Sequence, residues 1–153
     1  MIDQQRTLGW REWLALPDLG IGRIKAKVDT GARTSCLHAF YVDPVSHEGR
    51  DYVRFGVHPV QRNDDKVVHC EAEVVDQRQV SDSGGHSELR YVIRTRLALL
   101  DFDQVIELTL TNRDSMRFRM LLGRTSMSAG GFCVDPSASY LAGRPGKLKK
   151  ESK

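Results

Sequence analysis

The sequence has few aromatic residues, three cysteines and no long apolar run. Aromatic residues make up 7% of the 153 residues, and no apolar stretch approaches the roughly 20 residues that a membrane-spanning helix needs. The first ten residues, MIDQQRTLGW, lack the basic start and the apolar segment of a signal peptide. We therefore expect a cytoplasmic protein whose length accommodates one domain.

The cysteines and histidines offer little for metal binding. Cys36, Cys70 and Cys133 are far apart and form no CxxC pair, which argues against a disulfide framework and a thiolate zinc site. No histidine lies in an HExxH motif, and only Cys36 with His38, or His69 with Cys70, could contribute two ligands together. The glycine pattern of a phosphate-binding loop is also missing. We expect no bound cofactor, and any ATP dependence would come from a partner protein.

The charge of the chain says little about its ligand. The formal net charge is +3, and the last seven residues, KLKKESK, supply four lysines against one glutamate. No aromatic residue interleaves these lysines, so we expect no nucleic-acid binding. We expect a flexible N-terminus at 1–7, one domain at 8–142 and a disordered basic tail at 143–153.

Alternation of apolar and polar residues dominates the sequence. Residues 104–111, QVIELTLT, place three apolar side chains on one face of an expected strand and polar side chains on the other. Comparable stretches are 10–16, 21–28, 34–42, 52–57, 67–75, 89–100 and 117–122. These patterns predict an all-β domain, either a barrel or a sandwich.

Helix and turn signals are sparse. A single short helix is expected at 125–129, ended by Gly130 and Gly131. Turn-forming residues predict breaks at 17–20, 43–50, 61–66 and 81–87. Residues 77–87 are polar enough for a partly disordered hairpin tip.

The triplet Asp29-Thr30-Gly31 directly follows the alternating segment RIKAKV at 23–28. Asp before Gly usually marks a turn, because the carboxylate bonds nearby N–H groups and glycine accepts positive φ. Here the preceding strand would hold the carboxylate rigidly at its end. The triplet therefore has the context of a functional site.

A second segment, RMLLGRT at 119–125, places Leu121 and Leu122 before Gly123 and Arg124. An apolar strand into Asp-Thr-Gly-Ala, with a later apolar pair and Gly-Arg, resembles the pepsin-like fold in its half-sized, retroviral-protease form. In that fold the apolar-apolar-Gly strand passes beside the Asp-Thr-Gly turn, and a short helix follows. The resemblance implies a closed β-barrel of the acid-protease type with one short C-terminal helix.

One bacterial family matches more closely. GWREWLALPDLGIGRIKAKVDTGARTSCLHA, FRMLLGRTSM and FCVDPSASYL together resemble small retropepsin-like proteins that are commonly labelled ATP-dependent zinc proteases. Some members accompany glutamate ligases of the ATP-grasp type. The resemblance spans about residues 8–141 and implies that the protein is a peptide hydrolase.

Pepsin-like hydrolysis needs two carboxylates that share one proton, because one activates water while the other protonates the substrate carbonyl. Only Asp29 has the Asp-Thr-Gly context, which Asp114 and Asp135 lack. The resemblance therefore implies a homodimer in which the Asp29 residues of two chains meet at the twofold axis. Thr30 would lock the two turns together, and Gly31 would admit substrate or water.

The resemblance also implies residues that support the turn: Ala32, Leu121, Leu122, Gly123 and Arg124. Ala32 fits the tight space behind the turn. Arg124 would hold it through an ion pair, with a solvated arginine as the alternative.

Arg33 departs from the retroviral pattern, in which an acidic residue follows Asp-Thr-Gly-Ala. A cation beside the catalytic carboxylate would attract acidic substrates, and we expect glutamate-rich peptides or added glutamate tails. A plain surface arginine is the alternative.

The spacing of the two motifs also departs from the retroviral pattern. Gly123 follows Asp29 by 94 positions (123 minus 29), so the segment between them must hold extra strands or loops. We expect the flap over the substrate between residues 61 and 85.

Two other functions stay open. One is a non-catalytic retropepsin-like binding module that recognises acidic tails, or a ribosomal or ligase partner, through Arg33. The other is a zinc-dependent peptidase that uses Asp29 with His38 or Cys36.

Overall fold

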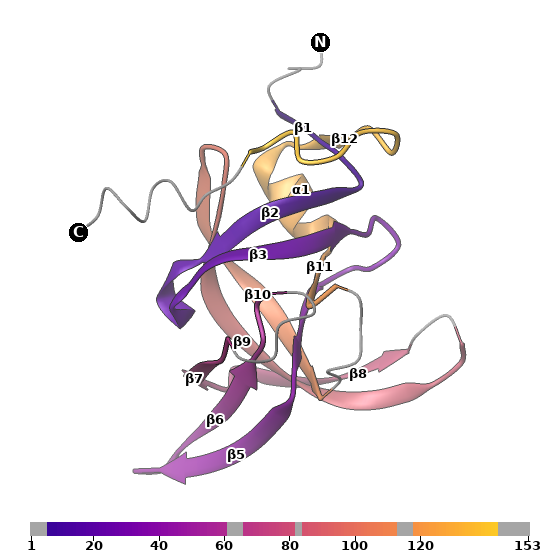
Figure 1. The fold of residues 1–153 in the computed structure, drawn as a ribbon. Coiled ribbons are helices and arrows are strands. Elements are labelled where there is room, and N and C mark those ends of the chain that lie inside the picture. The colour runs from indigo at the N-terminus through magenta and orange to yellow at the C-terminus, as the bar shows by residue number, and fades with distance from the viewer. Residues whose placement is uncertain (1–5, 61–65, 82–83, 113–117, 144–153) are drawn as a thin grey trace, which may run out of the picture.

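Six strands close into a β-barrel, which confirms the expected acid-protease-type fold (Figure 1). The computed structural model describes residues 6–60, 66–81, 84–112 and 118–143. The barrel strands are β2 (Arg11–Leu16), β3 (Ile21–Val28), β4 (Ser35–Ala39), β9 (Ser87–Leu99), β10 (Phe102–Asn112) and β11 (Met120–Leu122). They neighbour one another in the order β10-β4-β11-β3-β2-β9, and antiparallel pairing of β9 with β10 closes the barrel.

Further elements extend the barrel at both ends. The antiparallel sheet of β5 (Tyr41–His47), β6 (Arg50–Val57) and β7 (Val68–Glu73) projects from one end in Figure 1. β8 (Asp76–Ser81) forms a hairpin with β9. Towards the other end lie the parallel pair β1 (Thr7–Leu8) and β12 (Cys133–Val134) and the helix α1 (Arg124–Gly130), while the short helix η2 (Pro17–Leu19) joins β2 to β3.

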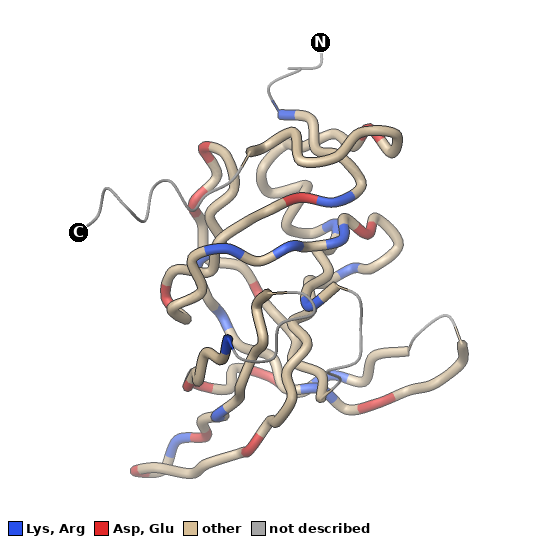
Figure 2. The backbone as a smooth tube through the Cα atoms, viewed as in Figure 1, with Lys and Arg blue, Asp and Glu red and all other residues tan. Residues whose placement is uncertain are grey.

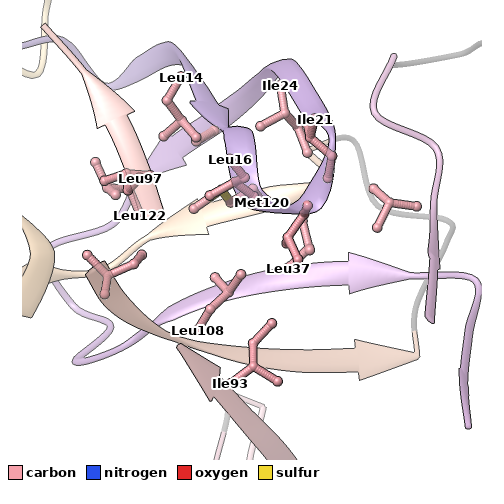
Figure 3. Close-up of a cluster of buried hydrophobic side chains, with 14 of the residues drawn as sticks. Leu14, Leu16, Ile21, Ile24, Leu37, Ile93, Leu97, Leu108, Met120 and Leu122 are labelled. Atoms are coloured by element: carbon pink, nitrogen blue, oxygen red, sulfur yellow. The ribbon is translucent and has the colours of Figure 1, made fainter. Parts of the chain in front are cut away.

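The core fills the inside of the barrel. On β3, Ile24 and Ala26 have no exposed surface, whereas the intervening Lys25 and the following Lys27 lie on the outside. Figure 3 shows buried side chains of the barrel strands meeting in one cluster; those of zero or near-zero exposure include Leu14, Leu16, Leu37, Ile93, Leu97, Leu108, Met120 and Leu122. Burying one such side chain contributes about 1.5–3 kcal/mol. The core therefore fixes the strands that carry the Asp-Thr-Gly turn.

Several sequence predictions are confirmed by the strands. Residues 21–28 form β3 with the expected bounds, and the helix expected at 125–129 is α1. The extra strands expected between Asp29 and Gly123 include the β5–β6–β7 sheet. In the part of the chain that the structure describes, no helix is long and apolar enough to cross a membrane.

Two predictions about loops are wrong. The break predicted at 43–50 is mostly strand, because β5 runs to His47 and only Glu48 and Gly49, with φ of 52° and 79°, make the turn. Residues 77–81 belong to β8 rather than to a disordered tip, although the antiparallel pairing of β8 with β9 confirms the hairpin itself. The sequence DQRQVS hides this strand because β8 is mostly exposed and is held by its ladder with β9.

The described structure begins ahead of the expected domain boundary at residue 8. Thr7 already pairs with Cys133 in the β1–β12 ladder. Residues 1–5 of the expected N-terminal segment and residues 144–153 of the expected tail lie outside the described residues.

A buried carboxylate ties the segment after β12 to the barrel. Glu12 has no exposed surface and accepts hydrogen bonds from the N–H groups of Gly9 at 2.6 Å, Leu141 at 3.0 Å and Ala142 at 3.0 Å. Three N–H donors compensate the cost of burying this charge. Glu12 therefore joins β2 to the C-terminal part of the described chain.

Candidate active site

Asp29 lies at the end of β3, where this strand runs beside β11. The two strands are parallel, and Leu122 pairs with Val28. The N–H of Asp29 continues this ladder and donates to the carbonyl oxygen of Leu122 at 2.9 Å. A segment far downstream in the sequence therefore fixes the backbone of Asp29.

The turn after Asp29 is closed by its own hydrogen bonds. Asp29 Oδ1 accepts from the N–H of Gly31 at 3.0 Å, and the carbonyl oxygen of Asp29 accepts from the N–H of Ala32 at 3.2 Å. The first of these bonds is a typical aspartate-turn contact. Asp29 is half-buried, and its Oδ2 atom has no hydrogen-bond partner among the described residues. One carboxylate oxygen therefore stays available.

Arg124 holds the turn from the side of α1. Its backbone N–H donates to the carbonyl oxygen of Ala32 at 2.8 Å. Its Nη1 donates to the carbonyl oxygens of Thr30 at 3.4 Å and Gly31 at 3.2 Å. Carbonyl oxygens thus take the place of the acidic partner in the expected ion pair, since no described carboxylate forms an ion pair with Arg124.

Gly123 allows the backbones of β4 and β11 to approach closely. A Cβ atom on Gly123 would lie 2.6 Å from the carbonyl carbon of Thr34 and 2.8 Å from the backbone nitrogen of Ser35. The N–H of Gly123 donates to Ser35 Oγ at 2.9 Å, and this oxygen lies 3.1 Å from Ser126 Oγ. Both serines are buried. Neither serine is predicted from the sequence, although the position of Ser35 shortly after the Asp-Thr-Gly triplet is a sequence signal for it.

Thr30 and Arg33 are exposed on the outside of the turn. Arg33 forms no ion pair with any acidic residue that the structure describes. It lines a depression of about 390 Å³ together with Thr34, with Arg78 of β8, and with residues of β10 and α1. The β8–β9 hairpin therefore borders the same depression as the segment after Asp29, and it is the candidate for the flap expected between residues 61 and 85.

The cysteine and histidine pairs make separate contacts. On β4, His38 Nδ1 lies 2.8 Å from a backbone carbonyl oxygen, and Arg90 donates to Cys36 Sγ at 3.4 Å. On β7, His69 is exposed, whereas Cys70 is buried and desolvation raises its thiol pKa from 9.0 to about 11. Among the residues with described positions, no group of three or more His, Cys, Asp or Glu side chains could hold a metal ion.

Of Asp114 and Asp135, which both lack the Asp-Thr-Gly context, the structure describes only Asp135. Asp114 lies outside the described residues. Asp135 Oδ1 accepts from the N–H of Ser137 at 3.0 Å and from its hydroxyl at 2.7 Å, and these bonds lower the pKa of Asp135 below 3.8. Asp135 forms a turn with its own neighbours.

A protein-family model described as "Retropepsin-like aspartic endopeptidase RimB" matches residues 7–145. The chain belongs to the RimB-like family. The match includes the Asp29 turn, β11 and α1, and it confirms the resemblance to bacterial retropepsin-like proteins. The barrel described above is thus the retropepsin-like fold of the RimB-like family.

Curated relatives of this RimB-like chain carry a ligase name. A "Probable alpha-L-glutamate ligase" of Shewanella pealeana is 47% identical over 151 residues, covering 99% of this chain and 33% of the relative. A protein of the same name from Parasynechococcus marenigrum is 47% identical over 136 residues, covering 89% of this chain and 29% of the relative. The chain spans about a third of the length of the curated relatives it matches.

A solved structure shares the fold. The crystal structure of a protein with unknown function from Legionella pneumophila matches with a TM-score of 0.69 and 28% identity, covering 88% of this chain and 95% of that chain. The architecture of the RimB-like chain therefore extends over nearly the whole of that protein.

Proposed function

We propose that this RimB-like protein is an aspartic endopeptidase that works as a homodimer, with Asp29 of each chain in one shared dyad. The Asp29 carboxylate carries the proposal. Asp29 lies at the end of β3, and its backbone N–H forms a hydrogen bond to Leu122. Its Oδ1 accepts a hydrogen bond within the turn, and its Oδ2 has no hydrogen-bond partner among the described residues. The mechanism needs two carboxyl groups, and one chain provides one of them. The second chain of a twofold dimer provides the other.

In the proposed dimer the two Asp29 carboxyl groups share one proton, because like charges at that distance cannot both ionise. The carboxylate takes a proton from a water molecule, and the water oxygen attacks the carbonyl carbon of the substrate. The carboxylic acid donates its proton to the carbonyl oxygen. The tetrahedral intermediate then collapses: one carboxylic acid of the dyad protonates the amine nitrogen, the C–N bond breaks, and the other carboxylate takes the proton of one hydroxyl group as the carbonyl forms again.

The surroundings of Asp29 suit this role. Thr30 and Gly31 are exposed and can contact a second copy of the chain. Arg124 and Leu122 hold the turn from within the chain, so the position of the carboxylate is set before two chains meet. The β8–β9 hairpin is the proposed flap.

Glutamate-rich peptides or glutamate tails are the proposed substrates. Arg33 lies four residues after Asp29, is exposed, and lines the depression beside the turn. A cation in this position would attract acidic side chains towards the dyad. The glutamate ligase name of the relatives supports a substrate that contains glutamate.

The test compares the wild-type protein with Asp29→Asn on a panel of glutamate-rich peptides, with products identified by mass spectrometry. Asparagine keeps the size of the side chain but cannot take up a proton from water. We expect the cleavage rate to fall by about a hundredfold to ten-thousandfold. Asp135→Asn is the matched control, because an exposed asparagine can also accept the Ser137 hydrogen bonds, and it should leave cleavage unchanged.

Other outcomes would support the other functions. Cleavage that survives Asp29→Asn would rule out the aspartic mechanism. Cleavage that a chelator abolishes would favour the zinc-dependent peptidase. Binding of the peptides without any cleavage by the wild-type protein would favour the non-catalytic binding module.

A further inference from the structure

Four basic side chains gather on the outer face of the β2–β3 hairpin: Arg11, Arg23, Lys25 and Lys27. We call this set the basic strip. Alternation places the three β3 residues on one face, while the residues between them point into the core. On the neighbouring strand Arg11 is the register partner of Lys27. Figure 2 shows blue Lys and Arg positions recurring along β3.

The described residues provide no ion-pair partner for the basic strip. Elsewhere ion pairs with aspartate or glutamate involve Arg6, Arg50, Arg54, Arg78, Arg90, Arg94 and Arg96. No acidic residue that the structure describes lies within ion-pair distance of a cation of the basic strip. Four cations without an ion-pair partner among the described residues therefore lie together on this face, and an anionic partner would complement them.

Aromatic rings lie beneath these cations. Trp13 and Tyr140 stack with ring centroids 5.9 Å apart and an interplanar angle of 23°. Lys25 Nζ lies 5.2 Å from the Trp13 centroid and 5.7 Å from that of Tyr140, and Arg23 lies 5.2 Å from that of Trp13. The rings hold the cations in place. Because the rings already contact each other and the cations, they are poor platforms for stacking nucleic-acid bases.

We propose that the basic strip is a docking surface for an extended acidic peptide segment. Alternate residues of a strand lie about 6.6 Å apart, and alternate side chains of an extended peptide have the same spacing. Carboxylates at every second position of such a peptide can therefore face Arg23, Lys25 and Lys27 in turn. The basic strip ends two residues before Asp29. This inference rests on the proposed function and adds to it a binding surface for the acidic substrate outside the dyad. Binding at the basic strip does not require hydrolysis of the peptide.

The test uses the full chain carrying Asp29→Asn, so that no peptide is cut, and a fluorescein-labelled peptide of ten glutamates. Fluorescence anisotropy at low salt gives the Kd. The variant Arg23→Gln/Lys25→Gln/Lys27→Gln should raise the Kd about tenfold, since each exposed ion pair contributes a factor of about 1.4 to 5. The control Arg50→Gln/Arg54→Gln/Arg94→Gln removes the same charge from exposed, ion-paired positions and should raise the Kd less than about twofold.

Three results would overturn the inference: equal weakening by both triple variants, no binding of the peptide by the parent chain, or tighter binding of a ten-nucleotide oligouridylate than of the peptide. Circular dichroism confirms that each variant is folded. If the triple variant does not fold, Lys27→Gln alone, at an exposed position, should raise the Kd about twofold. The same triple substitution is also made in a chain that keeps Asp29. If this variant still cleaves a four-residue peptide, the dyad is intact, and any loss of binding to the longer peptide belongs to the basic strip alone.

Discussion

The backbone N–H of Asp29 donates a hydrogen bond to the carbonyl oxygen of Leu122, 2.9 Å away. The two residues come from parallel strands that are far apart in the sequence. The position of the carboxylate therefore depends on the pairing of β3 with β11 as well as on the local turn. Changes in β11 should reach the candidate active site through this contact, and changes in α1 should reach it through Arg124.

Replacing Arg124 tests the support from α1. Arg124→Gln removes the hydrogen bonds to the carbonyl oxygens of Thr30 and Gly31. We expect a stability loss of about 1 kcal/mol and about a tenfold lower kcat, because a small displacement of the carboxylate is costly. Peptide cleavage and thermal unfolding measure the two effects. Unchanged kcat would show that Arg124 does not position the turn, and Arg50→Gln, at an exposed site, is the control.

Gly123 tests the close approach of β4 and β11. Gly123→Ala places a Cβ atom 2.6 Å from the carbonyl carbon of Thr34, so the backbone must shift, at a cost of about 1–3 kcal/mol. Gly31→Ala is the contrast, because its Cβ would meet Asp29 Oδ1 at 3.2 Å and no closer atom. Urea unfolding should show a large loss for Gly123→Ala and a smaller one for Gly31→Ala. Equal stabilities would contradict the close packing.

Glu12 tests the tie between β2 and the segment after β12. Glu12→Gln replaces one carboxylate oxygen with an NH2 group that faces the N–H donors of Gly9, Leu141 or Ala142. We expect a loss of about 1–3 kcal/mol and faster proteolysis within residues 135–142. Glu73→Gln, at an exposed site, is the control. A variant as stable as wild type would mean that the segment is held by other contacts.

Because the Cys70 thiol is buried, we expect the free energy of unfolding to fall at alkaline pH. Burial raises its pKa from 9.0 to about 11, so between these values the folded protein keeps the thiol proton that the unfolded chain has lost. The stability contribution of Cys70 is therefore complete below pH 9 and is lost as the pH rises towards 11. Urea unfolding from pH 8 to 11 should show a steeper decline for wild type than for Cys70→Ala. Parallel declines would contradict the shift.

Most strands of the barrel could be predicted from the sequence because alternation follows burial, whereas the closed barrel was implied by the resemblance to retropepsin-like proteins. On β3 the sequence IGRIKAKV places core residues between outward-facing basic residues, and the predicted bounds match. β8 could not be predicted, since DQRQVS is exposed and is held by backbone pairing with β9. Alternation of apolar and polar residues arises where one face of a strand is buried, and β8 has little buried surface.

The Asp-Thr-Gly turn could be located from the sequence, but the contacts that hold it could not all be predicted. Asp29 and Gly123 are visible because both belong to short motifs with distinct residue types. Ser35 and Ser126 meet only in the folded chain, 3.1 Å apart, and no motif joins them. Similarly, the charge of Arg124 suggests an ion pair, whereas the geometry provides carbonyl oxygens.

The shared dyad is tested most directly by mixing subunits. Wild-type protein is incubated with increasing amounts of Asp29→Asn until the subunits exchange, and peptide cleavage is measured per wild-type chain. A dimer with one Asp29 from each chain predicts that a threefold excess of the variant lowers this activity to about a quarter, because mixed dimers lack one carboxylate. Activity per wild-type chain that stays constant at every ratio would contradict the shared dyad.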